Sequence, residues 1–230
     1  MKLQDAIVLI TGANRGIGFA FAEAALARGA RKVYAGVRSP SSIKTPGLVP
    51  VKLDVTSDRD VAEAARICSD VTLVVNNAGI AHPGGLLDPK ATEAARGQLE
   101  TNFFGIVRMT QAFAPVLARN GGGAFLNVLS AASWINSGAM TAYAASKAAA
   151  WSLTNGLRNE LRKQRTQVLG LHVGFVDTEV TRGLDVIKVS PQSVAIAAFA
   201  ALEAGASEVL ADDRARMVKR GLTTEPPIYL

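Results

Sequence analysis

Cysteine and histidine are scarce in this chain of 230 residues, and aromatic side chains are few. The single cysteine, Cys68, excludes an internal disulfide and is expected to be an inert packing thiol; two histidines are too few for a metal site with several histidine ligands. No stretch approaches the roughly 18 uninterrupted apolar residues of a membrane-spanning helix. The apolar run at residues 6–11 is too short to indicate a signal peptide. We therefore expect a cytoplasmic protein that binds neither a metal nor a membrane.

The charge balance first suggests a nucleic-acid partner, because the formal net charge is +6. The positive charges are dispersed, however, and the densest patch, residues 212–222, contains its own acids and no aromatic residue. Hydrophobic residues make up 49% of the chain and charged residues 19%, which is typical of a folded domain. We expect one domain spanning residues 1–230, which binds an anionic cofactor and no nucleic acid.

Short apolar runs alternate with amphipathic or alanine-rich segments along the whole chain. The runs are rich in valine, leucine and isoleucine and do not alternate with polar residues, as expected of strands covered on both faces. We predict strands at 6–11, 32–37, 48–55, 71–77, 123–130, 167–174 and 207–211, and helices near 16–28, 58–67, 99–119, 142–164 and 191–204. This order predicts an α/β fold, a single-domain Rossmann-type doubly wound parallel sheet of about seven strands with helices on both faces.

A glycine-rich turn, TGANRGIG at residues 11–18, joins the first predicted strand to the first helix. Gly12, Gly16 and Gly18 permit a tight turn and a close approach of the backbone to a ligand. Main-chain N–H groups at a helix N-terminus favour phosphate. A glycine-rich turn without a ligand is the alternative, but the position after the first strand of an α/β chain favours a dinucleotide site.

The end of the second predicted strand indicates which dinucleotide binds. An acidic residue at this place usually bonds the ribose 2′-hydroxyl of NAD, but the chain has Val37 and Arg38 there. A carboxylate would repel a 2′-phosphate, whereas Arg38 can form a charge-assisted fork with it, and Arg15 can supply a second cation. The sequence therefore predicts NADP(H) in preference to NAD(H), the alternative being two exposed arginines without a ligand.

Tyr143 and Lys147 stand four residues apart in an alanine-rich segment, so their side chains are neighbours on a helix. An ammonium near a phenol lowers the tyrosine pKa, which would let Tyr143 exchange a proton near neutral pH. Ser130 ends a predicted strand thirteen residues earlier, on the ligand side of an open sheet. Alone, the pair indicates only a surface contact; together with Ser130 and the glycine turn it indicates proton-transfer chemistry.

These features resemble the short-chain dehydrogenase/reductase family along nearly the whole chain. The turn at 11–18, the segment Asn76-Asn77-Ala78-Gly79 and the pair Tyr143-x₃-Lys147 are similar to the family's signatures. The resemblance implies a catalytic tetrad of Asn102, Ser130, Tyr143 and Lys147. Tyr143 would be the general acid in reduction and the base in oxidation. Lys147 would tune Tyr143 and bond the nicotinamide ribose, Ser130 would orient the substrate oxygen, and Asn102 would support a proton relay through water.

Together, the turn and the resemblance predict the cofactor contacts. They are Gly12, Asn14, Arg15, Gly16, Ile17, Gly18, Arg38, Asp54, Val55, Asn76, Ala78, Gly79, Tyr143, Lys147, Gly174, Val176 and Thr178. Val173 stands where the family usually has proline, so we expect a looser loop after that strand. Only about a dozen residues separate Thr178 from the next predicted helix, which predicts a small substrate lid.

The substrate pocket is predicted from residues near Ser130 and Tyr143. Candidates besides these two are His82, Trp134 and Met140. A solvated loop position for His82 and core packing for Trp134 are equally open alternatives, and His172 is expected in the core or at an edge. The pocket composition favours an apolar or aromatic carbonyl compound.

Three functions fit these features. The leading one is an NADP(H)-dependent carbonyl reductase, or the reverse alcohol dehydrogenase. A catalytically silent NADP(H)-binding sensor or scaffold is the alternative, although such proteins usually lack part of the tetrad. An epimerase or dehydratase acting on a nucleotide sugar normally needs a longer C-terminal region. The alanines of helix 142–164, together with helix 99–119, predict a homodimer or homotetramer.

Overall fold

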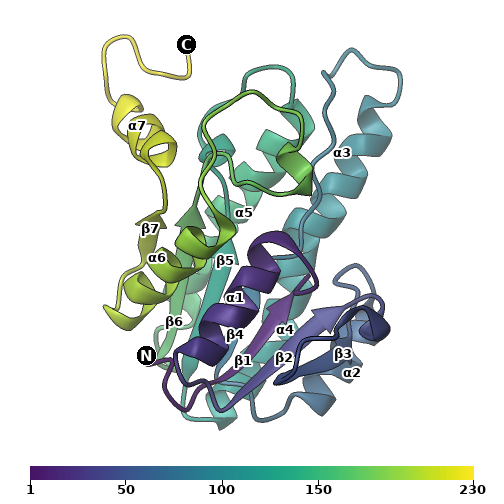
Figure 1. Cartoon of the computed structure of the whole chain (residues 1–230). Coiled ribbons are helices and arrows are strands. Elements are labelled where there is room, and N and C mark those ends of the chain that lie inside the picture. Colours follow the sequence, from purple (N-terminus) through teal and green to yellow (C-terminus); the bar gives the residue numbers. More distant parts are fainter.

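A computed structural model describes residues 1–230 and shows one parallel sheet of seven strands in the order β3-β2-β1-β4-β5-β6-β7 (Figure 1). The strands are β1 (Ile7–Thr11), β2 (Lys32–Val37), β3 (Leu48–Lys52), β4 (Leu73–Asn76), β5 (Gly123–Val128), β6 (Thr166–His172) and β7 (Glu208–Leu210). Every neighbouring pair runs parallel. The strand order reverses between β1 and β4, where open α/β sheets bind their ligands. The predicted doubly wound sheet is confirmed.

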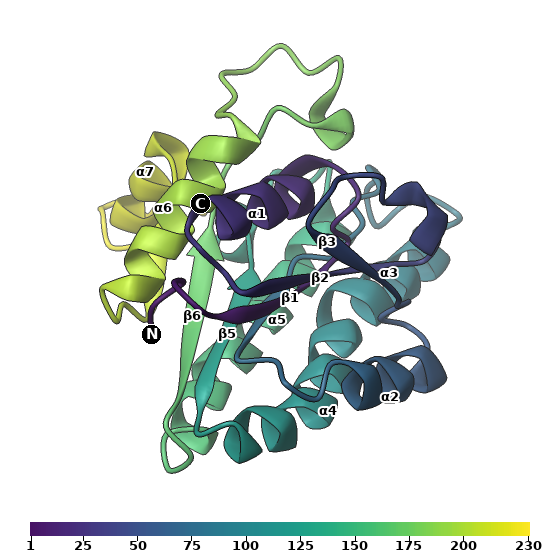
Figure 2. The ribbon, with the colours of Figure 1, turned by 60° about the horizontal axis from the view of Figure 1, so that its bottom comes forward.

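Helices cover both faces of the sheet. Figure 2 shows α1 (Gly16–Ala27) and α6 (Pro191–Glu203) on one side, with α2 (Asp58–Ile67) and α4 (Gly105–Arg119) on the other; α5 (Thr141–Glu160) contributes to the same apolar core as α2 and α4. Each face has its own apolar core, and the strands contribute alternate side chains to the two. This two-sided burial explains the continuous apolar runs. None of the helices combines the length and apolar content needed to cross a membrane.

Two helices were not predicted. α3 (Ala91–Leu99) precedes the expected helix at 99–119 and continues through a π-helical segment, η2 (Glu100–Phe104), into α4. α7 (Asp213–Gly221) occupies the charged patch near the C-terminus. Its buried side consists of Ala215, Val218 and Gly221, a face too small to give an apolar period that sequence patterns reveal.

The side chain of Thr11 joins β1 to the segment that follows β4. Its hydroxyl accepts hydrogen bonds from the main-chain N–H groups of Asn77 and Ala78, each at 2.9 Å, and the residue is 1% exposed. The Asn77 amide donates in return to the carbonyls of Thr11 at 2.8 Å and Gly12 at 3.3 Å. These bonds hold the glycine turn against the end of β4.

Replacing Thr11 by valine should therefore destabilise the protein. Thr11→Val keeps the shape but leaves the Ala78 N–H without its acceptor and the Asn77 N–H with only the Val75 carbonyl at 3.1 Å. The free energy of unfolding should fall by about 1–3 kcal/mol, the cost of one buried unpaired group. Denaturant unfolding followed by circular dichroism measures the change. Thr11→Ser keeps the hydroxyl and should lose less than half as much; equal losses would show that the methyl group, not the hydroxyl, matters.

Candidate active site

The glycine turn gives an uncapped helix N-terminus. α1 begins at Gly16, its N-cap Arg15 makes no side-chain capping bond, and the first turn has no acidic residue. Gly12 has φ +68°, and a Cβ on Gly18 would lie 2.3 Å from the Gly12 carbonyl oxygen, so these two positions require glycine. Free N–H groups in a first turn that has no carboxylate of its own fit the anionic diphosphate of a dinucleotide.

Arg38 lies where a 2′-phosphate was predicted, exposed just after β2. Arg38 is close to Asp54, because the Arg38 charge is one of the causes that lower the pKa of the Asp54 carboxyl. Burial works in the opposite direction, and hydrogen bonds from Thr56 at 2.9 and 2.8 Å contribute more to the lowering than Arg38 does. Asp54 therefore stays ionised beside a guanidinium that makes no ion pair closer than 4 Å.

Arg15 is engaged elsewhere. Its guanidinium forms an ion pair with Glu179, at the start of the 3₁₀ segment η4 (Glu179–Thr181). Both side chains are more than half exposed, so the pair is weak and open to competition by another anion. A Cβ on Gly16 would lie 3.3 Å from Thr178 Cγ2, which places the glycine turn beside the beginning of the lid.

Some predicted cofactor residues point into the core. Val55 and Val176 belong to the two apolar cores, and the Asn76 amide donates to Asn127 Oδ1 at 2.8 Å. The side chains of Val55, Val176 and Asn76 therefore contact the protein interior and do not face the predicted cofactor site. Contact with a cofactor through their main chains stays a prediction. Exposed or half-buried at the same edge are Asn14, Ile17, Ala78, Gly79, Gly174 and Thr178.

Asn102 lies in the π-helical segment η2 and is 1% exposed. Its Oδ1 accepts from the Ile80 N–H at 2.8 Å, and its Nδ2 donates to the Ile80 carbonyl and to Ser146 Oγ, both at 2.9 Å. The extra residue of a π-turn is often found at functional sites. Here it turns the asparagine toward the strand-end segment that contains Gly79.

The other three tetrad residues lie at the same edge. Lys147 is 5% exposed, donates from Nζ to the Val128 carbonyl at 2.8 Å, and lies 5.8 Å from the centre of the Tyr143 ring. A Cβ on Gly79 would lie 3.1 Å from Asn102 Oδ1 and 3.7 Å from Lys147 Nζ. The Ser130 hydroxyl is close enough to influence the Tyr143 phenol. The four side chains therefore lie at one edge of the sheet, and their catalytic roles stay a prediction.

The predicted lowering of the Tyr143 pKa is wrong. Burial raises the pKa of the Tyr143 phenol above its ordinary value, and the Ser130 hydroxyl acts in the opposite direction without reversing it. Burial also lowers the pKa of Lys147 to about 8. Helical spacing places the two residues together, but desolvation outweighs the expected effect of the ammonium on the phenol.

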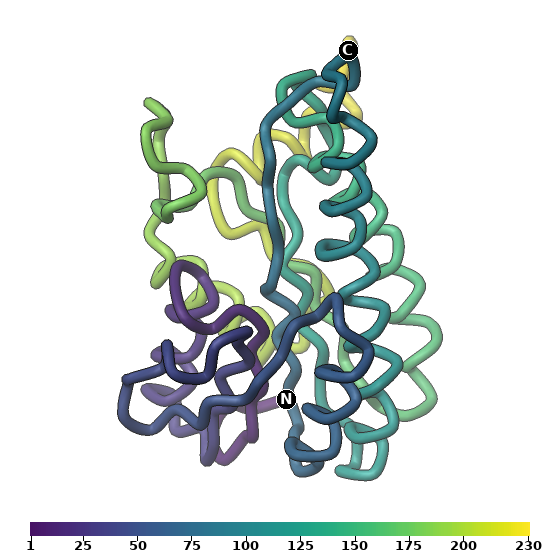
Figure 3. The backbone as a smooth tube through the Cα atoms, turned by 90° about the vertical axis from the view of Figure 1, so that its right-hand side faces the viewer, coloured from purple at the N-terminus to yellow at the C-terminus, as the bar shows by residue number.

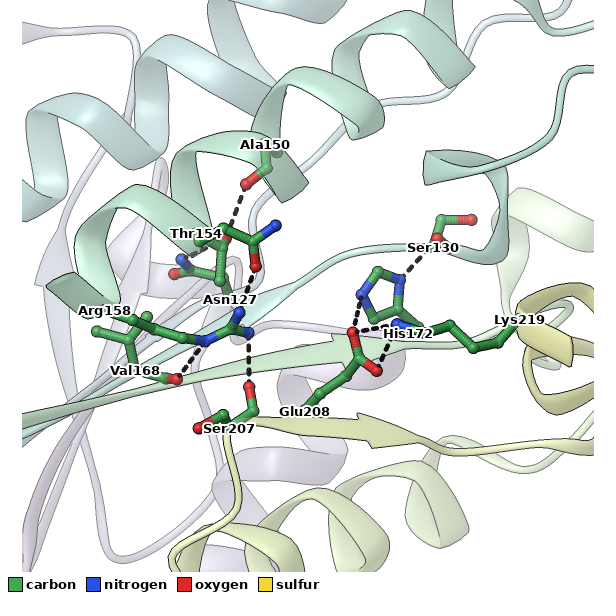
Figure 4. Close-up of polar contacts among 11 residues, drawn as sticks. Asn127, Ser130, Ala150, Thr154, Arg158, Val168, His172, Ser207, Glu208 and Lys219 are labelled. Atoms are coloured by element: carbon green, nitrogen blue, oxygen red, sulfur yellow. Dashed lines mark hydrogen bonds and ion pairs between the residues drawn. The ribbon is translucent and has the colours of Figure 1, made fainter. Parts of the chain in front are cut away.

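Buried polar side chains connect the strands beneath the site. Asn127 of β5 accepts from Asn76 of β4 at 2.8 Å. It donates to Thr154 Oγ1 of α5 at 3.0 Å, and that hydroxyl donates to the Ala150 carbonyl at 2.7 Å (Figure 4). These bonds fix α5, which contains Tyr143 and Lys147, relative to the strands that end at the site. The sequence analysis missed Asn127 and Thr154.

The predicted pocket residues separate into two groups. His82 is exposed and Met140 half-buried; their loops pair through the Gly84 N–H and the Ala139 carbonyl at 2.9 Å. A cavity of about 190 Å³ opens under the His82 loop, between α3 and Ala142. Trp134 instead stacks on His172 at 3.8 Å between ring centres and packs against Trp151, so packing replaces its expected place in the pocket.

The loop after β6 is held by a residue that sequence reasoning missed. Asp212 is 5% exposed; its Oδ2 accepts from the Gly174 N–H at 2.7 Å and its Oδ1 caps α7 through the Ala215 N–H at 2.8 Å. Arg214 lies over the Phe175 ring at 5.0 Å. The loop therefore has tertiary restraints in place of the missing proline. Nothing in the local sequence near Gly174 indicates a partner so far along the chain.

Known proteins share these features. The short chain dehydrogenase family model matches residues 6–186. A short chain dehydrogenase from Burkholderia cenocepacia J2315, solved in complex with NADP, is 40% identical with a TM-score of 0.94, covering 98% of this chain and 96% of that one. An uncharacterized oxidoreductase of Staphylococcus aureus (strain MW2) is 30% identical over 213 residues, covering 87% of this chain and 92% of the relative.

A Burkholderia phymatum short chain dehydrogenase/reductase in complex with NAD shares the fold at 23% identity, with a TM-score of 0.87 over 96% of this chain and 94% of that one. The family match spans the glycine turn, the segment after β4 and the tetrad. The chain therefore belongs to the short-chain dehydrogenase/reductase family and is an oxidoreductase that binds a nicotinamide cofactor.

Proposed function

We propose that this protein is an NADP(H)-dependent oxidoreductase that interconverts a carbonyl compound and a secondary alcohol. The observation that carries the proposal is the convergence of Asn102, Ser130, Tyr143 and Lys147 at the edge where β4 and β5 end. The NADP complex of the 40% identical Burkholderia cenocepacia protein supports the choice of cofactor.

The residues divide the chemistry as follows. When bound, the nicotinamide supplies the hydride in reduction and accepts it in oxidation. Ser130 orients the carbonyl oxygen, and the Tyr143 hydroxyl gives its proton to that oxygen, leaving a phenolate; in oxidation the phenolate takes the proton back. Lys147 stabilises the phenolate by its positive charge. Its pKa of about 8 allows exchange of the replacement proton close to neutral pH.

Loss of the phenol tests this assignment. Tyr143→Phe should reduce kcat by roughly 100-fold or more, because general acid catalysis contributes about 10²–10⁴-fold. The Kd for NADPH should stay within about twofold of the unmodified protein. NADPH absorbance with a panel of ketones measures turnover, and NADPH fluorescence measures binding.

Tyr229→Phe, at an exposed tyrosine near the C-terminus, is the matched control and should leave both quantities unchanged. Full activity of Tyr143→Phe would contradict the proposal. Tight NADPH binding by the unmodified protein without turnover of any carbonyl compound would favour the sensor or scaffold.

Selectivity for NADP(H) is proposed to depend on Arg38. The strand end has no carboxylate to bond a 2′-hydroxyl, and Arg38 is exposed without an ion pair. Arg15 contributes less, because it would first have to leave Glu179. A planar guanidinium forms two parallel hydrogen bonds to a phosphate, so one arginine is enough to discriminate.

Replacing Arg38 by glutamine should therefore remove selectivity without removing binding. The Kd for NADPH should rise about 10- to 100-fold, since a hydrogen bond to a charged group contributes about 1.5–3 kcal/mol, while the Kd for NADH should not change. Fluorescence titration with each cofactor measures the ratio. Arg119→Gln, at an exposed arginine ending α4, controls for the lost charge. An unchanged NADPH/NADH ratio in Arg38→Gln would overturn this role.

The substrate is proposed to be apolar. The segment between β6 and α6 stands out from the carboxyl edge of the sheet (Figure 3), and its exposed side chains include Val180, Leu184, Val186 and Ile187. Across the site, the loop before α3 exposes Leu86 and Leu87. Apolar side chains that remain in water on both sides of a site favour a ligand that covers them.

A further inference from the structure

His172 lies directly behind Ser130 and has not been given a function. It ends β6, is fully buried, and its Nδ1 lies 3.1 Å from the Ser130 carbonyl oxygen (Figure 4). A carbonyl oxygen only accepts hydrogen bonds, so Nδ1 must carry the proton and donate it. The imidazole is therefore assigned as the Nδ1–H tautomer.

The surroundings of the ring keep it fixed. Trp134 stacks on one face at 3.8 Å between ring centres and an angle of 16°. The charged groups that face it are Glu208 of β7, whose Oε1 is 3.6 Å from Nε2, Lys219 of α7 and Arg158 of α5. Lys219 occupies both Glu208 oxygens, at 3.0 and 2.8 Å. Burial lowers the pKa of His172 to about 4, so the ring is neutral at neutral pH.

The Ser130 carbonyl needs a hydrogen-bond donor from outside the β4–β5 strand pair. The last β4–β5 pair is Asn76 with Asn127, so Ser130 lies three residues beyond it. Its carbonyl accepts one bond from the Ser133 N–H at 3.0 Å, within the short segment η3 (Ala131–Ser133), and the second from His172. Its hydroxyl accepts from the Ala132 N–H at 3.1 Å. The imidazole thus fixes the main chain from which the hydroxyl projects.

We propose that His172 is a positioning residue for Ser130. The Nδ1–H bond sets the orientation of the Ser130 peptide and, through it, the direction of the hydroxyl toward Tyr143. Without this donor the carbonyl keeps only the Ser133 bond, and the peptide can tilt about the bond from its own N–H, that of Ala131, to the Val173 carbonyl at 2.9 Å. This role rests on the proposed function, in which the Ser130 hydroxyl orients the substrate oxygen.

The kinetic test is a double-mutant cycle with Ser130→Ala. His172→Phe keeps a flat ring for Trp134 but removes the donor, and kcat should fall about tenfold, the effect of one hydrogen bond, while the Kd for NADPH stays within twofold. In the Ser130→Ala background the same substitution should change kcat by less than twofold. Equal losses in both backgrounds, or a parallel loss of NADPH binding, would show a general structural role and overturn the proposal.

Two variants sharpen the result. His172→Asn places its amide nitrogen on Cγ as Nδ1 is in histidine, and it should recover at least half of the lost kcat. Glu208→Gln changes the Nε2 side of the ring and the pair with Lys219 but leaves the Nδ1 bond in place, and it should leave kcat within twofold of the unmodified protein. If kcat did not recover in His172→Asn, or fell tenfold in Glu208→Gln, the Nδ1 hydrogen bond would not be the cause of the lower kcat in His172→Phe.

Amide hydrogen exchange gives a readout that needs no substrate. In His172→Phe the Ala132 and Ser133 amides, which donate to Ser130, should exchange at least tenfold faster, while the β5 ladder amide of Leu126 is unchanged. If the unmodified protein reduced no carbonyl compound, the proposed function would fail, yet faster exchange confined to Ala132 and Ser133 would still support the positioning role. Unchanged exchange at both amides would overturn it.

Discussion

The parallel pairing of β1, β4, β5 and β6 is the constraint on which the site depends. Because paired strands run in one direction, the segments that follow them begin at the same edge. The glycine turn, Gly79, Ser130 and Gly174 share that edge although most of the chain separates the first from the last. Burial on both faces fixes the register, because a slip of one residue would exchange the two cores.

Local patterns predicted the strands, the glycine turn and the Tyr143–Lys147 pair, because apolar runs, glycine spacing and helical periodicity are properties of neighbouring residues. Contacts between distant segments were beyond them. Asp212, which follows α6 and β7 in the sequence, accepts a hydrogen bond from the Gly174 N–H. Trp134 stacks on His172 of β6. α3 and α7 have small buried faces, so no apolar period marked them.

Desolvation of the Tyr143–Lys147 pair is a second property that the spacing of the two residues in the sequence does not predict. Burial raises the pKa of the Tyr143 phenol, which therefore stays protonated at neutral pH, and lowers the pKa of Lys147 to about 8, so the ammonium still carries its charge there. The protonated phenol is the form that the proposed carbonyl reduction would consume. The Val128 carbonyl that holds Lys147 belongs to the last residue of β5, two residues before Ser130, so Lys147 and Ser130 are both tied to the end of one strand.

Transfer of a labelled hydride from NADPH to a carbonyl compound is the direct test of the proposed oxidoreductase reaction. The protein would be mixed with NADPH carrying deuterium at both C4 positions of the nicotinamide and with separate apolar ketones, aromatic ketones and sugars, and the products analysed by mass spectrometry. We expect an alcohol with one deuterium on the former carbonyl carbon, formed from the apolar or aromatic ketones. NADPH binding with no labelled alcohol from any carbonyl compound would contradict it.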